Sequence, residues 1–198
     1  MDLKTYFKTY PVTCSFVILI VFIFLLMTLA GGSQNDRVLI GFGANFYPRV
    51  SGGEYWRLIT CNFLHIGIMH LVLNSVALLA LGGMAESLFR KTKYVLLILL
   101  SGFFAALTSC LFHPNSISAG ASGVVFGIVG AILVNAWKEP RFRASGITSS
   151  LGLLVVINLV FGFIMPYVDN AAHIGGLIAG AIVGGFYRGI RYFREKEL

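Results

Sequence analysis

Four polar side chains interrupt the apolar stretches of this 198-residue chain, and their types suit acyl transfer. Ser122 stands at the start of one apolar run, His173 near the start of another, and His70 and Asn74 lie together in a third. A serine hydroxyl is a weak nucleophile until a base takes its proton, and histidine is the usual base. We therefore predict a Ser122–His173 dyad. No aspartate lies in an apolar run, and Asp169, the nearest to His173, is expected in a loop.

The same residues include donors for the charge that such a reaction creates. Attack on an amide carbonyl produces an oxyanion, which needs hydrogen-bond donors placed in advance. His70 and Asn74 are four residues apart, so they share one face of a helix. The backbone N–H of Ser122 at a helix start is a third donor. We expect His70, Asn74 and Ser122 to form an oxyanion hole.

Six apolar runs dominate the chain. They cover roughly residues 11–30, 66–84, 94–112, 122–137, 148–165 and 171–187. Hydrophobic residues make up 57% and charged residues 12%, against about 45–50% and about 25% in soluble domains. A bilayer core is about 30 Å thick and needs about 20 apolar residues per helix. The sequence predicts an all-α, polytopic bundle of six transmembrane helices in one domain, 1–198. The first run is too long for a signal peptide.

The polar groups are expected at one depth. Counting to the first charged residue at the inner end of each run gives 16 residues for His70, 16 for Ser122 and 15 for His173. At 1.5 Å per residue, each group lies about 22–24 Å above that boundary. Three helices would then bring polar groups to a common plane near the outer surface.

Basic residues indicate the orientation. Twelve of the 15 lysines and arginines fall at the two termini and in the second and fourth connections, and positive residues prefer the cytoplasmic side. Both termini are therefore expected in the cytoplasm, and the basic tail 188–198 next to anionic lipid. The net charge of +7 is explained by this topology, so a nucleic-acid role has little support. The long connection 31–65 is rich in aromatic residues and is expected to form a structured outer loop.

Each residue also has a structural interpretation. Ser122 alone is more often a packing or capping serine, His173 a histidine bonded to a carbonyl, and His70 with Asn74 interhelical polar contacts. A zinc site is not expected, because no H-E-x-x-H occurs and the spacing of His65 and His70 would split them across a helix. The three cysteines show no paired spacing that would indicate a metal site or disulfides.

Small residues favour close contact of two helices. Gly123 and Gly127 in one run, and Gly176, Gly180 and Gly184 in another, form GxxxG patterns. Such spacing lets helix backbones approach closely. This approach would bring Ser122 within hydrogen-bond reach of His173.

These motifs together resemble those of the rhomboid intramembrane serine proteases. GASG (120–123), HLVLN (70–74), NAAHIGG (170–176), the Trp56–Arg57 pair and LGGMAE ending at Glu86 follow the order of that family. The likeness runs from about residue 52 to 187, and residues 188–198 follow it as a tail.

The resemblance implies a rhomboid-like six-helix fold with Ser122 as nucleophile and His173 as base and then acid. The substrate would be a transmembrane helix of another membrane protein, unstable and cut near its outer end, with no metal or cofactor. The family's gate would lie around the fifth span and Pro166. Supporting roles are implied for a set of matching residues: Trp56, Arg57, Glu86, Gly120, Gly123, Phe126, Asn170 and Gly176.

Two positions depart from many relatives. Cys61 stands where many bacterial relatives carry a further histidine, and Phe126 where some carry a tyrosine that stacks on the catalytic histidine. Phenylalanine keeps the aromatic face, so we expect the stacking to survive.

Two other function classes remain to be distinguished from a protease. A catalytically silent relative would bind transmembrane helices without cutting them, but such relatives usually lack the serine or histidine. A transporter or channel would need polar residues continuing inward, whereas the runs below Ser122 and His173 are apolar. We expect a multi-pass protein of a bacterial plasma membrane, with membrane proteins and lipid as its partners.

Overall fold

The computed structural model describes residues 2–138, 144–165 and 168–187. Within these residues the chain is helical, and a single isolated bridge pairs Asn45 with Ser118. The predicted tail 188–198, Pro166 and the basic residues Arg141 and Arg143 lie outside the described part. The all-α expectation is confirmed for the part that is described.

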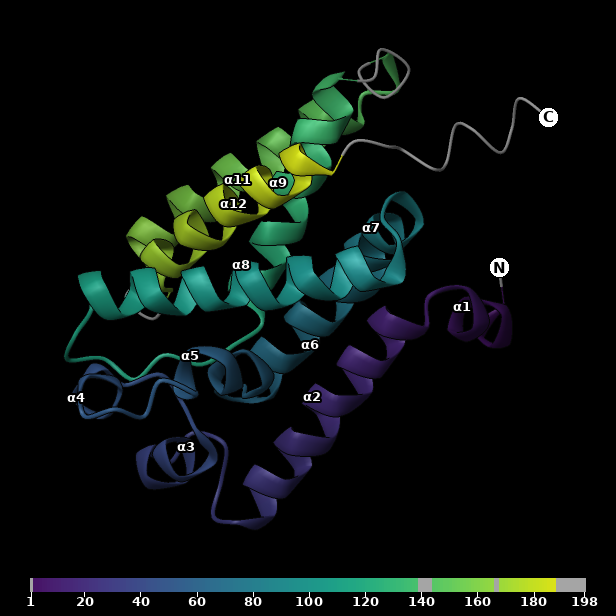
Figure 1. The fold of residues 1–198 in the computed structure, drawn as a ribbon. Helices are drawn as coiled ribbons and strands as arrows, with labels where there is room; N and C mark the ends of the chain where they lie inside the picture. The colour runs from purple at the N-terminus through teal and green to yellow at the C-terminus, as the bar shows by residue number, and fades with distance from the viewer. Residues whose placement is uncertain (1, 139–143, 166–167, 188–198) are drawn as a thin grey trace.

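Every apolar run identified in the sequence is a helix (Figure 1). The elements are α1 Leu3–Thr9, α2 Pro11–Leu29, α3 Asp36–Phe42, α4 Tyr47–Ser51, α5 Arg57–Thr60, η1 Cys61–Phe63, α6 Ile68–Ala77, η2 Leu78–Gly82, α7 Gly83–Leu88, α8 Lys91–Phe112, α9 Ser122–Lys138, α11 Ile147–Ile164 and α12 Asn170–Phe186.

Four of these helical segments are long and apolar enough to cross a membrane. They are α2, the continuous helix Ile68–Leu88 formed by α6, η2 and α7, then α8 and α11. The helices α9 and α12 are apolar but have 17 residues each, about 26 Å of rise. The presence of several spans is thus supported, and the count of six stays a prediction.

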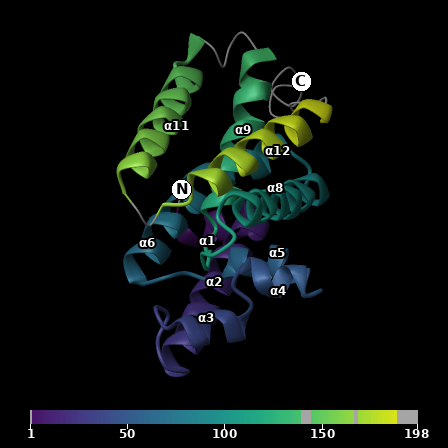
Figure 2. The same ribbon diagram turned by 90° about the vertical axis from the view of Figure 1, so that its left-hand side faces the viewer.

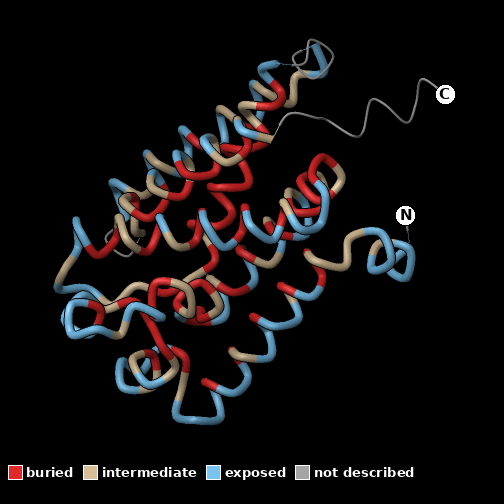
Figure 3. The backbone as a smooth tube through the Cα atoms, viewed as in Figure 1, coloured by how far each residue is buried: buried red, intermediate tan, exposed pale blue. Residues whose placement is uncertain are grey.

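Helix α9 is the centre of the bundle. Twelve of its 17 residues are buried, and Figure 3 shows it as an almost continuous buried segment. It packs against α12 and α8, and Figures 1 and 2 show α12 running beside it. A helix that is apolar on all sides is expected in the interior. The first residue of this central helix is Ser122.

Glycines permit the contact between α9 and α12. A Cβ atom on Gly176 would overlap the carbonyl oxygen of Gly123, and one on Gly180 would overlap that of Gly127. Further along, the side-chain amide of Asn135 donates to the carbonyl of Gly184 at 2.9 Å. The close approach predicted from the glycine spacing is therefore present over about two turns of both helices.

Helix α11 is the most loosely packed of the long helices. Only Leu151 and Val155 of its 18 residues are buried. Figure 2 shows it on the outer side of the bundle, next to α9 and α12. It therefore depends on few contacts for its position.

The connection 31–65 is ordered, as expected, and folds into α3, α4, α5 and η1 at one end of the bundle (Figure 1). The guanidinium of Arg57 is buried and donates to the carbonyls of Ile40 at 2.7 Å and Ala44 at 3.1 Å. It also pairs with Glu54 at 2.5 Å and lies 4.6 Å from the ring centroid of half-exposed Trp56. The Trp56–Arg57 pair thus holds the loop in shape.

Glu86 caps a helix from a distance in sequence. Its buried carboxylate accepts hydrogen bonds from the backbone N–H groups of Val12 at 3.0 Å and Thr13 at 2.9 Å, at the start of α2. A carboxylate at this position complements the positive end of the helix dipole. One turn earlier, Gly82 makes room for the side chain of Tyr94, because a Cβ atom added to Gly82 would lie 2.6 Å from the Tyr94 hydroxyl. The LGGMAE motif therefore serves helix packing.

Candidate active site

Ser122 is presented by a loop that is tied down just before it. The N–H of Gly120 donates to the carbonyl of Cys61 at 3.0 Å. The N–H of Ala121 donates to Nε2 of His65 at 3.4 Å. Ser122 itself is partly buried and opens α9, where the first N–H groups have no acceptor within the helix. The two residues before Ser122 are therefore held by hydrogen bonds to the segment 61–65.

His70 lies against this loop. A Cβ on Gly120 would lie 2.5 Å from Cε1 and 2.8 Å from Nε2 of the imidazole. Gly120 also has φ +150, a conformation that favours glycine. The glycine two residues before Ser122 is therefore needed for both space and backbone shape. Because Gly120 has no side chain, the imidazole of His70 can approach the loop.

Asn74 lies one turn after His70 on α6, as the spacing predicted. It is buried, and its amide donates to the carbonyl of His70 at 3.0 Å. An amide nitrogen carries two donors, and this bond uses one. The asparagine thus belongs to the same polar face as His70.

His173 is brought to α9 by an aromatic contact. Its imidazole stacks on Phe126 with ring centroids 4.2 Å apart and an interplanar angle of 9°. The stacking expected from the resemblance is confirmed. Phe126 lies one turn after Ser122 on α9, so His173 packs against the face of α9 that carries Ser122. No hydrogen bond among those of the described residues joins Ser122 to His173 directly.

One nitrogen of the His173 ring has no hydrogen-bonded acidic partner in the described part of the chain. Its Nδ1 is buried and makes no hydrogen bond within the described part of the chain. In a serine triad a carboxylate would hold this nitrogen. The dyad of Ser122 and His173 stays a prediction.

One sequence expectation about histidines is wrong. His65 and His70 are not split across a helix, because α6 begins only at Ile68 after Gly67, which has φ +81. Their rings meet edge to face with centroids 5.3 Å apart. Burial, together with the neighbouring His70, lowers the pKa of His65 to about 3. His65 is therefore a neutral acceptor for the loop before Ser122, and the glycine was the signal that could have located it.

Asn170 connects α12 to α11. Its amide nitrogen donates to the carbonyl of Leu159 at 3.0 Å, and its Oδ1 is buried without a partner among the described residues. The amide fits against Gly162, where a Cβ would overlap it. Asn170, a predicted supporting residue, therefore links α12 to the loosely packed α11 by a hydrogen bond.

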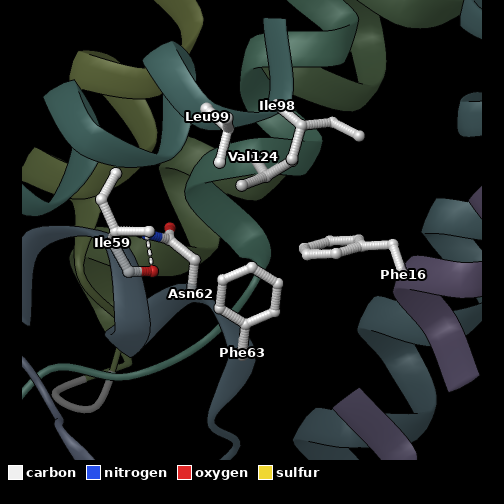
Figure 4. A pocket seen from close by; sticks show the side chains of 7 residues that line it. All are labelled: Phe16, Ile59, Asn62, Phe63, Ile98, Leu99 and Val124. Carbon is white, nitrogen blue, oxygen red and sulfur yellow. Dashed lines mark hydrogen bonds between the residues drawn. The ribbon is translucent and has the colours of Figure 1, made fainter. Parts of the chain in front are cut away.

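An apolar hollow elsewhere in the bundle is lined by none of the candidate site residues. It lies between α2, η1 and α8 and has a cavity volume of about 10 Å³, about enough for one water. Figure 4 shows Phe16 and Phe63 turned toward each other, with Asn62 bonded to the carbonyl of Ile59 at 3.0 Å. None of its lining residues is a candidate for the chemistry: Phe16, Ile59, Asn62, Phe63, Ile98, Leu99 and Val124.

A bundle of apolar helices with a serine, two histidines and an asparagine gathered around the start of its central helix defines an integral, multi-pass membrane protein with an interior polar site. Residues 52–189 match the Rhomboid domain family. The chain belongs to this family.

Several relatives are similar over most of this chain. Rhomboid protease GluP of Bacillus subtilis is 39% identical over 168 residues, which are 85% of this chain and 33% of the relative. RHOMBOID-like protein 4 of Arabidopsis thaliana is 41% identical over 68% of this chain and 34% of its own length. Rhomboid-like protease 3 of Toxoplasma gondii is 31% identical over 77% of this chain and 59% of its own length. The chain thus spans about a third of the first two relatives.

Proposed function

We propose that this protein is an intramembrane serine endopeptidase that uses a Ser122–His173 dyad. The observation that carries the proposal is the stacking of His173 on Phe126, one turn from Ser122 on α9. Two relatives in the same family are named as proteases. The unpartnered Nδ1 of His173 supports a dyad rather than a triad.

The proposed reaction follows acyl-transfer chemistry. Ser122 Oγ attacks the peptide carbonyl while His173 takes its proton. The oxyanion accepts hydrogen bonds from His70, Asn74 and the Ser122 N–H. His173 then protonates the leaving amine, and a water that it activates releases the acyl group from Ser122. The steps need neither metal nor cofactor.

The proposed setting is a single catalytic domain with six spans and both termini in the cytoplasm. The serine would lie near the outer surface of a bacterial plasma membrane, and the tail 188–198 would contact lipid. The buried apolar residues that follow Ser122 on α9 support water access from one side only. This arrangement suits hydrolysis and does not suit conduction.

The proposed substrate is a transmembrane helix of another protein that unwinds easily near its outer end. A helix in lipid keeps its amides in internal hydrogen bonds, so it must unwind before a serine can reach one. Helix α11 buries only two of its described residues and packs loosely beside α12, which supports entry of the substrate helix from the lipid at this point.

Two assays on the purified protein test the proposal. A fluorescent fluorophosphonate should label the wild-type protein. It should label neither the Ser122→Ala nor the His173→Ala protein, although both variants should have the thermal stability of wild type. In liposomes, wild type should cut a reporter whose transmembrane helix has small residues near its outer end. Binding of the reporter without cleavage or labelling would instead support a silent helix-binding relative. Full-rate cleavage by Ser122→Ala would overturn the assignment of the nucleophile.

A further inference from the structure

The partly buried carboxylate of Asp169 joins the start of the helix that carries His173 to the loop that leads to Ser122. We propose that Asp169 is a positioning residue that sets His173 relative to Ser122, an inference that rests on the proposed function. Asp169 lies four residues before His173, and its partner Ser118 lies four residues before Ser122. One side chain therefore connects the two segments that carry the reacting groups.

The first half of the connection runs through the start of α12. Asp169 is the N-cap of this helix, and its Oδ1 accepts a hydrogen bond from the N–H of Ala172 at 2.9 Å. Its backbone carbonyl accepts one from the N–H of His173 at 3.1 Å. The carboxylate is thus fixed to the same helical turn as the base. The sequence expectation of a simple loop residue missed this cap.

The second half runs through the other carboxylate oxygen. Oδ2 accepts hydrogen bonds from the hydroxyls of Ser118 at 2.9 Å and Ser109 at 2.5 Å. Ser118 belongs to the loop that leads into α9, and Ser109 is buried on α8. Hydrogen bonds to an ionised carboxylate are shorter and stronger than neutral ones. Asp169 therefore ties three segments together at one point.

The Ser118 end of the connection is itself rigid. Ser118 and Asn45 exchange two backbone hydrogen bonds, each 2.9 Å long. Asn45 is buried, and its amide donates to the carbonyl of Ala106 on α8 at 2.9 Å. From the exposed side, Nε2 of His113 lies 3.8 Å from Oδ1 of Asp169. The carboxylate thus links the start of α12 to a loop that is itself hydrogen-bonded to Asn45, and through it to α8.

Such a link matters because proton transfer depends on geometry. A displacement of about 1 Å between reacting groups can cost about 100-fold in rate. The carboxylate of Asp169 bonds to Ser109, Ser118 and the N–H of Ala172. Among the described residues it bonds to neither the Ser122 nor the His173 side chain, so it acts through the helix and loop that it joins.

Two serines allow a matched test. Ser118→Ala and Ser109→Ala each remove one hydroxyl donor from the same oxygen, and both leave the cap on Ala172 intact. Only Ser118 lies in the loop that leads to Ser122. We expect Ser118→Ala to lower kcat and the fluorophosphonate labelling rate about 10-fold, within the range that misplacement produces. KM should stay unchanged, and Ser109→Ala should keep the wild-type rate at a similar thermal midpoint.

Rescue and coupling distinguish positioning from general stability. Ser118→Thr keeps the hydroxyl and should restore the rate. Asp169→Asn keeps a cap of similar size, and combining it with Ser118→Ala should cost less than the two separate losses predict, because both break one link. If Ser118→Ala were labelled at the wild-type rate, or if both serine variants lost the same fraction of that rate, the role of Asp169 would be overturned and the proposed function would stand. A folded wild type that neither labels nor cleaves would overturn the proposed function and this inference with it.

Discussion

The ring of Phe126 lies flat on the imidazole of His173, with centroids 4.2 Å apart and planes 9° from parallel. The contact joins α9 and α12 one turn after Ser122, the proposed nucleophile. Stacked aromatic pairs contribute about 0.5–1.5 kcal/mol beyond burial. Phe126 therefore helps to orient a ring whose Nδ1 has no hydrogen-bond partner among the described residues.

Replacing this phenyl ring should reduce activity through the orientation of His173. We expect Phe126→Leu to lower the labelling rate about 2- to 10-fold, since each 1.4 kcal/mol corresponds to about a tenfold change. Phe126→Tyr, which keeps the ring, should stay near wild type. Labelling time courses at saturating and subsaturating probe would separate binding from reaction. Equal rates for Leu and Tyr variants would argue against a role for stacking.

The crossing of α9 and α12 should tolerate no added methyl group. A Cβ on Gly176 would overlap the carbonyl of Gly123, so Gly176→Ala must push the helices apart. Overpacking of this kind costs about 1–3 kcal/mol. We expect a lower thermal midpoint in detergent and loss of labelling.

Gly152→Ala on α11 is the control for that substitution. A Cβ at this position meets nothing within 4 Å, and alanine is a better helix former than glycine. Its midpoint should not fall. A Gly176→Ala protein as stable and active as the Gly152→Ala protein would contradict the close crossing.

The helices and their tightest contact could be predicted from sequence because both depend on local patterns. Long apolar runs specify helices, and the four-residue glycine spacing specifies the α9–α12 crossing. The histidine–asparagine face of α6 follows from helical periodicity alone. Local pattern also predicted an ordered outer loop from its aromatic residues.

The contacts that hold the site in place join residues far apart in the chain and carry no local pattern. His65 reaches Ala121 across 56 residues, and Ser109 reaches Asp169 across 60. Glu86 marks the end of its apolar run in the sequence, yet it is a buried cap of α2. Such partners depend on how the helices are arranged, which spacing within one helix does not specify.

The amide of Asn170 should control the mobility of α11. Asn170→Ala removes the hydrogen bond from α12 to the carbonyl of Leu159 on α11. We expect faster deuterium uptake in the second half of α11, with uptake of α9 unchanged.

A second asparagine gives the matched control. Asn158 lies on α11, but its amide bonds within the same helix, to the carbonyl of Leu154 at 2.9 Å. Asn158→Ala should leave the uptake of α11 near the wild-type level. Similar uptake in both variants would show that Asn170 does not restrain the helix.

His65 should make the stability of the protein fall in acid. Its pKa is about 3 in the folded protein because of burial and the neighbouring His70, against about 6.5 in an unfolded chain. Between these values the unfolded state binds a proton that the folded state does not, so the free energy of unfolding falls as the pH drops below about 6.5. Lowering the pH from 8 to 5 should lower the free energy of unfolding by about 2 kcal/mol through this residue.

His65→Gln, which has no titrating ring, should show a correspondingly shallower loss of thermal midpoint over that range. Midpoints of wild type and variant measured from pH 8 to pH 5 in one detergent provide the comparison. Parallel curves would mean that His65 is not the neutral acceptor that holds Ala121, and a shallower curve for the variant would assign the acid sensitivity of the nucleophile loop to this histidine.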